Sequence, residues 1–498
     1  AYLRDLGVGA LWLSPIYPSP MKDGGYDVAD YTGIDPLFGD MDGFDELLTE
    51  AHAHGLKLLM DFVPNHSSDQ HPWFQAALQG KDSPKRDWYV WADPSADGGP
   101  PNNWRSNFGG SAWTLDEPSG QYYYHAFLSS QPDLNWRHPE LRQAMLDAMR
   151  FWLERGVDGF RVDVIYYLFN DEQLRDNPPN PDWQAGMPDI QRYRPVHTTD
   201  QPEVQDVIEE MRDLIDSYDD RLLIGEIYLP VDRLVAYYGR DGVEGVHLPF
   251  NFQLIQAEWN AEHLAELIDH YEGALPEKGW PNWVLSNHDQ PRIAARVGHA
   301  QARIAAMLLL TLRGTPTLYY GDELGIGKVD IPPDRIQDPQ ARNEPGVGFN
   351  RDSSRTPMPW SDETHAGFSS TEPWLPLNAD WGERNVSVQS SSPSSLLNLY
   401  RDLLALRRRE TPLRRGSYKR LFAEDGVLAY ERQAEGERLG ILLNLTDDPS
   451  EFRIPPDYAE AAVLLSTLDD PAPPAGGSMM LRGGEGVILR PQLKGKSP

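Results

Sequence analysis

The sequence predicts an α/β protein built on a (β/α)8 barrel (TIM barrel), with a small inserted domain and an all-β C-terminal part. Three observations carry this prediction. Apolar segments typical of buried strands alternate with helical segments over most of the 498 residues. A stretch rich in Trp, Asn, Gly, Pro and Ser interrupts this alternation in the first third of the chain. The last part of the chain consists of short segments with strand periodicity alone.

The alternation of helix and strand can be followed from the first residue. Ala1 to Gly7 is predicted as the end of a helix, because glycine commonly closes helices. The segments 8–13 and 56–63 (LKLLMDFV) are apolar runs, as expected for strands of a parallel sheet that is buried on both faces. Further helices are predicted at 42–54, 138–155, 203–217 and 395–410, and further strands at 158–164, 222–227, 246–252, 283–286 and 316–320.

The predicted strands are one fewer than the eight that such a barrel has, so we expect the first strand to precede Ala1. A loop without regular structure between Ser67 and Ser130 would be unusually long, so this segment is predicted to be an inserted domain. The expected organisation is a barrel over 1–66 and 131–416, an insertion at 67–130 and a C-terminal β domain at 417–498.

The composition argues against several classes of protein. Asp and Glu outnumber Lys and Arg by 76 to 45, and the formal net charge of −31 makes nucleic acid an unsuitable partner. The absence of cysteine excludes disulfides and thiolate chemistry. No apolar run reaches about 18 residues, so no membrane span is predicted. No basic stretch leads into an apolar one near Ala1, and we therefore expect a cytoplasmic protein.

Charged side chains occur where the predicted strands end, which is where barrels of this kind carry their chemistry. In DGFRVDV at 158–164 the apolar residues alternate, and Arg161 and Asp163 share the opposite face. Other predicted strands are followed or ended by Asn65 and His66, by Glu226, and by His288 and Asp289.

Asp163, Glu226 and Asp289 are evenly spaced along the chain, which places them on three strands around one mouth. A single acid at a strand end is usually a helix N-cap or a partner in a salt bridge. That explanation suits a gathering of three acids, two histidines and an arginine poorly, because buried charges cost stability and are kept mainly at functional sites.

Paired carboxylates in a cleft are typical of glycoside hydrolysis. Arg161 is expected to keep Asp163 ionised, as a nucleophile requires. Glu226 has no neighbouring cation in the sequence, and the charges of Asp163 and Asp289 are expected to raise its pKa, which suits a proton donor.

Motifs in order along the chain resemble those of α-glucosidases of the α-amylase superfamily (glycoside hydrolase family 13), close to the oligo-1,6-glucosidases. They span nearly the whole chain: GYDVADY at 25–31, DFVPNH at 61–66, QPDLNW at 131–136, GFRVDV at 159–164, GEIY at 225–228, SNHDQPR at 286–292 and RTPMPW at 355–360. The resemblance implies that the insertion is domain B of the family and that residues from about 417 form its β-sandwich domain C.

The resemblance implies catalytic roles for the three acids. Asp163 matches the nucleophile of a retaining mechanism, Glu226 the general acid/base, and Asp289 the third acid, which distorts and stabilises the bound sugar. Further matching residues are implied to hold the glucose in the innermost (−1) subsite: Arg161, His66 and His288 at its hydroxyl groups, and Tyr26 under its ring.

Four more residues are implied to shape the binding site. Asp27 and Arg355 match the pair that closes the pocket at the non-reducing end and makes the enzyme exo-acting. Phe127 resembles an aromatic residue that lines the +1 subsite. Val164, directly after the predicted nucleophile, goes with acceptance of α-1,6 linkages in this family, although valine also suits any buried strand.

The implied function is hydrolysis of terminal α-linked glucose from short oligosaccharides or disaccharides, with transglucosylation when a sugar replaces water. A sucrose isomerase or transglucosidase is the alternative among enzymes, although DRIQD at 334–338 resembles the charged loop of sucrose isomerases only in part. A non-catalytic relative acting as a partner subunit is the alternative from another class. Many relatives carry a calcium loop after the first strand, and since that region is absent from this chain, no metal is assigned and no other cofactor is expected. Calcium is the alternative.

Overall fold

The computed structural model describes residues 1–240 and 242–492. Its helices are α1 Tyr2–Leu6, α2 Met41–Ala53, α3 Pro72–Ala77, α4 Pro139–Arg155, α5 Val204–Asp216, α6 Val231–Leu234, α7 Gln253–Gln256, α8 Ala261–Ala274, α9 Ile293–Thr311, α10 Pro339–Asn343, α11 Val386–Ser391, α12 Leu396–Arg409 and α13 Thr411–Arg415. Its strands are β1 Ala10–Leu13, β2 Lys57–Phe62, β3 Trp91–Ala92, β4 Trp113–Asp116, β5 Gln121–Tyr124, β6 Gly159–Val162, β7 Leu222–Gly225, β8 Leu248–Pro249, β9 Asn282–Val284, β10 Thr315–Thr317, β11 Ser417–Glu424, β12 Val427–Ala434, β13 Glu437–Asn444, β14 Ser450–Arg453, β15 Ala462–Ser466, β16 Ser478–Leu481 and β17 Gly486–Arg490.

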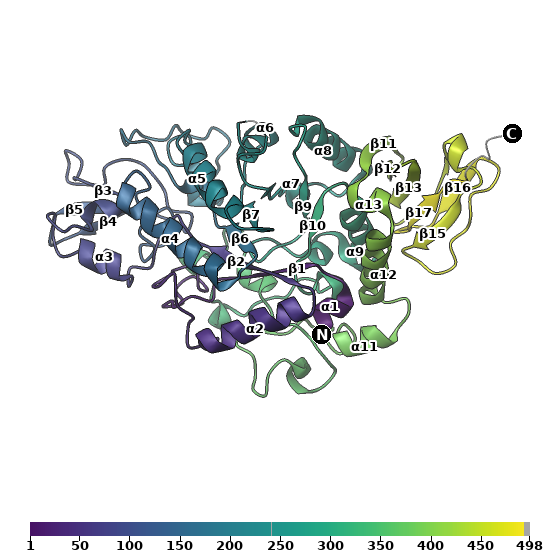
Figure 1. The fold of residues 1–498 in the computed structure, drawn as a ribbon, viewed down its shortest axis with the longest axis horizontal. Coiled ribbons are helices and arrows are strands. Elements are labelled where there is room, and N and C mark those ends of the chain that lie inside the picture. The colour runs from purple at the N-terminus through teal and green to yellow at the C-terminus, as the bar shows by residue number, and fades with distance from the viewer. Residues whose placement is uncertain (241, 493–498) are drawn as a thin grey trace.

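The barrel strands lie in the centre of the molecule, with helices outside them (Figure 1). Strands β1, β2, β6, β7 and β8 pair in that order, all parallel, and β9 pairs in parallel with β10. A parallel bridge between Asn251 and Trp283 continues the order from β8 to β9. Every strand predicted for the barrel is therefore present, and the predicted fold class is confirmed.

Most strands are shorter than the apolar runs that predicted them. The largest difference is at β8, which covers only Leu248–Pro249 of the predicted 246–252. Pro249 has no N–H to donate, so the hydrogen bonds to β7 come from the N–H groups of His247 and Phe250 on either side of it. Gly159 opens β6 at φ +144, and a Cβ there would lie 1.9 Å from the Leu222 carbonyl oxygen, so only glycine lets β6 approach β7 at this point.

The predicted helices are confirmed to within one or two residues. Helix α4 buries Met145, Met149 and Trp152 on one side, which is the spacing of an amphipathic helix. It ends at Gly156, whose φ of 104° is the left-handed conformation that glycine adopts at helix ends. Helix α1 ends in the same way at Gly7.

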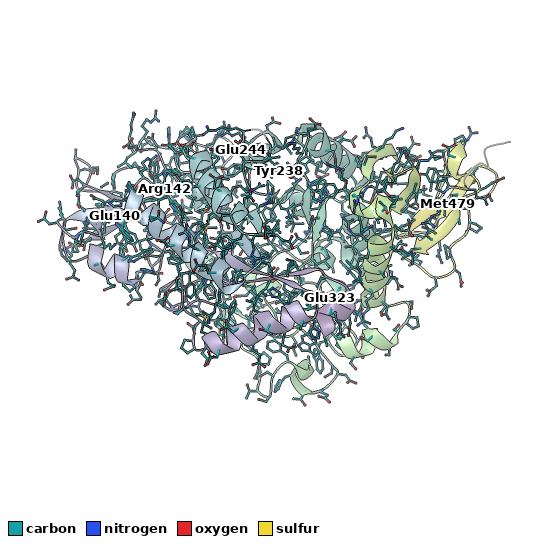
Figure 2. The ribbon with its side chains drawn as sticks, in the orientation of Figure 1. Glu140, Arg142, Tyr238, Glu244, Glu323 and Met479 are labelled. Atoms are coloured by element: carbon teal, nitrogen blue, oxygen red, sulfur yellow. The ribbon has the colours of Figure 1, made fainter. Side chains whose placement is uncertain are left out.

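The two regions without the barrel pattern lie at opposite ends of the molecule (Figure 1). Strands β3, β5 and β4 form an antiparallel sheet inside the predicted insertion. Strands β11, β12, β13, β17 and β15 form the C-terminal antiparallel sheet, and β14 pairs with β16. Met479 of β16, labelled in Figure 2, packs with Ala429 and Leu442 in the apolar layer between these sheets. No helix in the described part of the chain is long and apolar enough to cross a membrane.

Candidate active site

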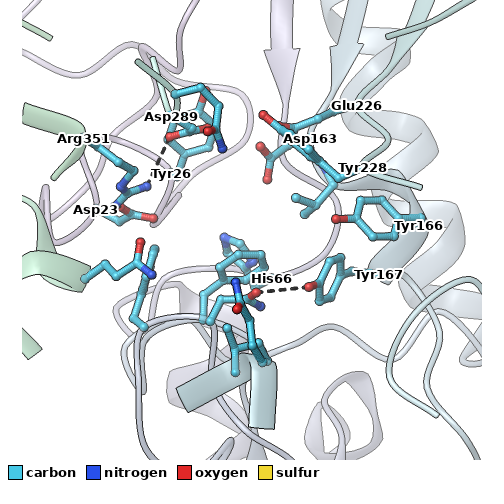
Figure 3. Close-up of a pocket in the computed structure, with 18 residues that line it drawn as sticks. Asp23, Tyr26, His66, Asp163, Tyr166, Tyr167, Glu226, Tyr228, Asp289 and Arg351 are labelled. Atoms are coloured by element: carbon cyan, nitrogen blue, oxygen red, sulfur yellow. Dashed lines mark hydrogen bonds and ion pairs between the residues drawn. The ribbon is translucent and has the colours of Figure 1, made fainter. Parts of the chain in front are cut away.

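A cavity of about 390 Å³ opens at the carboxyl ends of the barrel strands. Most of the predicted site residues line it: Tyr26, His66, Phe127, Asp163, Val164, Glu226 and Asp289. Figure 3 shows Asp163 and Glu226 on one side of the cavity, and Asp23 and Arg351 across from them. Its size and its few convergent polar groups are those of a small-molecule site.

Arg161 is the centre of the charged cluster and is fully buried. Its Nη1 donates to Asp163 Oδ1 at 2.6 Å and to Asp61 Oδ1 at 2.9 Å, and its Nη2 lies 2.7 Å from Glu226 Oε2. Asp61 comes from β2 and faces Arg161 directly in the β2–β6 ladder. One guanidinium thus fixes the orientation of three carboxylates, and it holds Asp163 and Glu226 close to each other.

The backbone after β6 adds one more constraint. Val164 has φ +35°, a conformation that β-branched residues rarely adopt. In this conformation its N–H donates to Glu226 Oε2 at 3.0 Å. Both polar contacts that the Glu226 carboxylate makes with the described residues therefore fall on Oε2, and none of these residues donates to Oε1.

The expectation that Arg161 keeps the pKa of Asp163 low is wrong, and Arg161 also contacts Glu226, which has no neighbouring cation in the sequence. Burial raises the pKa of the Asp163 carboxyl well above its usual range, against the lowering effect of Arg161. Burial also raises the pKa of Glu226, and Asp289 adds to this effect, as expected from the sequence. Burial alone would lower the pKa of Arg161, but its carboxylate neighbours raise it well above the usual value.

Asp289, the third predicted acid, is in a different electrostatic position. It lies 2.8 Å from Arg355 Nη2, 3.3 Å from Arg351 Nη1 and 3.2 Å from His288 Nε2. Burial opposes ionisation, but these three neighbours together hold the pKa of Asp289 below its usual range. Asp289 is therefore an anion over the whole working range of pH.

Both predicted histidines are buried and neutral at working pH. Burial lowers the pKa of His66 and that of His288 to about 3. The ring of Tyr26 stacks on His288 with centroids 5.4 Å apart, and its hydroxyl donates to Asp61 at 3.0 Å. Phe127 packs against His66 with centroids 5.1 Å apart.

The predicted pair of Asp27 and Arg355 does not form. Asp27 is fully buried and accepts from Ser19 Oγ and from the backbone N–H groups of Lys22 and Asp23, so its carboxylate organises a turn. Arg355 turns to Asp289 and to the carbonyl of His288.

The carboxylate and guanidinium that meet across the pocket are Asp23 and Arg351, with Arg351 Nη2 donating to Asp23 Oδ1 at 2.8 Å. Both residues line the cavity, and Arg351 also contacts Asp289. The GYDVADY motif begins just after Asp23, and RTPMPW just after Arg351, so the motif boundaries left both residues out. Asp61 is the first residue of the DFVPNH motif. Its position as a charged residue in an apolar strand could have indicated a role in the site.

The described residues contain no group of three or more acidic or histidine side chains placed to hold a metal ion. The acids of the pocket are bound to arginine instead, as the contacts of Arg161 and Arg351 illustrate.

Comparison with known proteins identifies the family. The profile of the α-amylase catalytic domain matches residues 1–416. A probable α-glucosidase of Rhizobium meliloti (strain 1021) is 38% identical, with 91% of this chain and 85% of that protein covered. An oligo-1,6-glucosidase of Halalkalibacterium halodurans is 36% identical, with 94% and 89% covered. The crystal structure of the α-glucosyl transfer enzyme XgtA superimposes with a TM-score of 0.92 at 40% identity, covering 99% of this chain and 93% of that one. The chain therefore belongs to the α-amylase family, glycoside hydrolase family 13, among its relatives named α-glucosidase and oligo-1,6-glucosidase.

Proposed function

We propose that this protein is a retaining, exo-acting α-glucosidase that removes terminal α-linked glucose from disaccharides and short oligosaccharides. The single observation that carries the proposal is the Arg161 cluster, in which one guanidinium contacts both Asp163 and Glu226. In retaining enzymes the two carboxyl groups are only about 5–5.5 Å apart, whereas inverting enzymes separate them further to admit water.

Asp163 is the proposed nucleophile. Oδ1 is held by Arg161, which leaves Oδ2 to attack the anomeric carbon. Glu226 is the proposed acid, since Oε1 is free to carry the proton and the nearby charge of Asp289 favours the protonated form. The proton passes to the leaving oxygen as the glucosyl–enzyme bond forms, and Glu226 then takes a proton from the attacking water.

Asp23, Arg351 and Asp289 support exo action. Arg351 bonds to both acids, so the three side chains form one connected charged wall of the pocket. A glucose in this pocket would present its remote hydroxyl groups to that wall, and a chain extending beyond its non-reducing end would clash there. Asp289 and the neutral His66 and His288 are proposed to bind hydroxyl groups of the same glucose.

A transglucosidase is the second candidate, because the α-glucosyl transfer enzyme XgtA matches 99% of this chain in structure. Hydrolysis and transfer share the glucosyl-enzyme and differ only in the acceptor. A non-catalytic partner subunit is a poorer proposal, because such a subunit has no need for three buried acids around one pocket.

The test is to measure initial rates and products on isomaltose, maltose, sucrose and trehalose side by side. The proposal expects free glucose from at least one of them, with isomaltose among the better substrates if Val164 selects α-1,6 linkages. Isomerised disaccharide as the main product from sucrose would favour an isomerase. No release of nitrophenol from 4-nitrophenyl α-glucoside would favour the non-catalytic alternative.

A further inference from the structure

Three loops from distant parts of the chain meet at the mouth of the pocket. They are the segment 105–110 of the predicted insertion, the short 3₁₀ helix Asp189–Arg192, and α10 with the residue that follows it. Each loop contributes uncharged side chains to the pocket lining: Asn107 and Phe108, Ile190 and Gln191, and Gln340. We call this arrangement the mouth triangle.

Each pair of loops in the mouth triangle is joined by a polar contact. Glu344 Oε1 accepts from the backbone N–H of Asp189 at 2.9 Å. Asp189 Oδ2 in turn accepts from the N–H of Gly110 at 3.2 Å. Asn343 Nδ2 donates to the Phe108 carbonyl at 3.0 Å, which closes the triangle.

Glu344 fits this place closely. A Cβ on Gly109 would lie 2.8 Å from Glu344 Cγ, and Gly109 has φ +87°, so glycine leaves the space through which the Glu344 side chain passes. The carboxylate oxygen that does not reach Asp189 is buried and lacks a hydrogen-bond partner among the described residues. A buried oxygen without a hydrogen bond lowers the stability of the folded protein, so the position of the Glu344 side chain is maintained at the expense of folding free energy.

The mouth triangle is also anchored to the inner wall. Asp338 accepts from the N–H of Gln340 at the start of α10, and from Arg351 Nε at 2.9 Å. Arg351 is the residue that reaches Asp23 and Asp289 inside the pocket. The outer and inner walls are therefore parts of one connected frame.

We propose that Glu344 is a positioning residue that fixes the outer wall of the pocket, and that this wall selects a neutral polyhydroxyl group as leaving group and as acceptor. The amides of Gln191 and Gln340 offer donors and acceptors to hydroxyl groups, and Phe108 and Ile190 offer apolar surface. The Asn107 amide, which also bonds to Ala126 and Tyr167, keeps one N–H for a ligand. The proposal rests on the proposed function. In the transfer step the bond between the anomeric carbon and Asp163 breaks, a bond to the acceptor oxygen forms, and the acceptor proton passes to Glu226.

The test compares two substrates that deliver the same glucosyl group. α-Glucosyl fluoride has a leaving group too small to contact the outer wall, whereas the better of maltose and isomaltose has a sugar that occupies it. In Glu344→Ala the ratio of kcat/KM for the disaccharide to that for the fluoride should fall about tenfold, with the fluoride rate nearly unchanged. Glu344→Gln keeps an oxygen that can accept from Asp189 and should behave as the wild type.

Glu262 provides the matched control, because it is exposed on α8, outside the pocket, and Glu262→Ala should leave both rates unchanged. Asn343→Ala removes the hydrogen bond to the Phe108 carbonyl, and because Asn343 is exposed, this variant should fold even if Glu344→Ala does not. It should lower the same ratio. An unchanged ratio in Asn343→Ala and in any folded Glu344→Ala would overturn the proposal. A wild-type protein that hydrolyses neither substrate would instead overturn the proposed function itself.

Discussion

Buried arginines occur in two regions of this molecule, and their hydrogen-bond partners differ between the two. In the pocket, Arg161 and Arg351 each contact three carboxylates. At the junction between the barrel and the C-terminal sheet, Arg407 and Arg432 meet backbone carbonyls instead. Arg407 donates to the carbonyls of residues 310, 312 and 314, and Arg432 to those of residues 311, 416 and 417.

The difference shows in the pKa values. Carboxylate neighbours raise the pKa of Arg161 despite its burial. At the junction, burial and the neighbouring Arg407 lower the pKa of Arg432 to about 9, and burial lowers that of Arg407 to about 10. Burying a cation among carbonyls satisfies its hydrogen bonds and fixes a junction. Burying a cation among carboxylates also affects the protonation and the orientation of groups that can react.

The largest expected effect is on the pocket side of this comparison. Asp163→Asn keeps the shape of the side chain and removes the attacking charge, so nearly all turnover of α-glucosides should be lost. The far-ultraviolet circular dichroism and the melting temperature should stay close to those of the wild type. Wild-type rates in this variant would remove Asp163 from the mechanism.

Glu226→Gln should have the next largest effect. Removing a general acid costs about 10²–10⁴-fold in rate, and the loss should be greatest for maltose, whose leaving oxygen needs a proton. For α-glucosyl fluoride, whose leaving group needs little help, formation of the glucosyl-enzyme should be much less affected. Equal losses on both substrates would contradict the assignment of Glu226 as proton donor.

The pH profile tests the same two acids in the unmodified protein. Activity needs Asp163 ionised and Glu226 protonated, and burial raises the pKa of both. As pH falls, kcat/KM should decline at a pH above the ordinary aspartate value, because Asp163 takes up a proton. As pH rises through the raised pKa of Glu226, kcat/KM for maltose should fall about tenfold per pH unit. A profile flat up to pH 9 would contradict this account.

At the junction, Arg432→Met should lower the stability of the protein without changing its catalytic activity. Three carbonyls lose a buried donor, and we expect the free energy of unfolding to fall by about 2 kcal/mol while kcat/KM stays unchanged. Arg420→Met is the matched control, because Arg420 forms a surface pair with Asp269 at 3.0 Å and is 42% exposed. Its effect should be below about 1 kcal/mol. Denaturant unfolding followed by fluorescence measures both, and equal effects of the two variants would contradict the comparison.

The smallest expected effect is that of metal removal. The proposed steps use only side chains of this chain, so dialysis against EDTA should change kcat/KM and the melting temperature by no more than experimental error. A loss of activity that added Ca²⁺ restores would contradict this expectation.

Much of the fold could be predicted because its signals are local. The barrel strands stand out as apolar runs, and helices such as α4 end at glycines visible in the sequence. The short strands of the insertion could not be predicted individually, because β3 covers only two residues and depends on pairing with β5. Hydrophobicity alone also did not give the length of β8, which covers only Leu248–Pro249 of a longer apolar run.

The site divides in the same way. Arg161, Asp163 and Glu226 lie at strand ends, where alternation and register fix their direction, and they were predicted. Asp23 and Arg351 were not, since their contact joins loops that are 328 residues apart in the chain. The contact of Arg161 with Glu226 was missed for a related reason, because cations near in space need not be near in sequence.

The central claim is that Asp163 attacks the anomeric carbon and Glu226 then delivers water to the same face that the leaving group occupied. Proton NMR of the first glucose released from maltose, recorded before mutarotation, tests it most directly. The account predicts α-glucose as the initial product. Initial release of β-glucose would show inversion, and it would contradict the covalent mechanism assigned to this pocket.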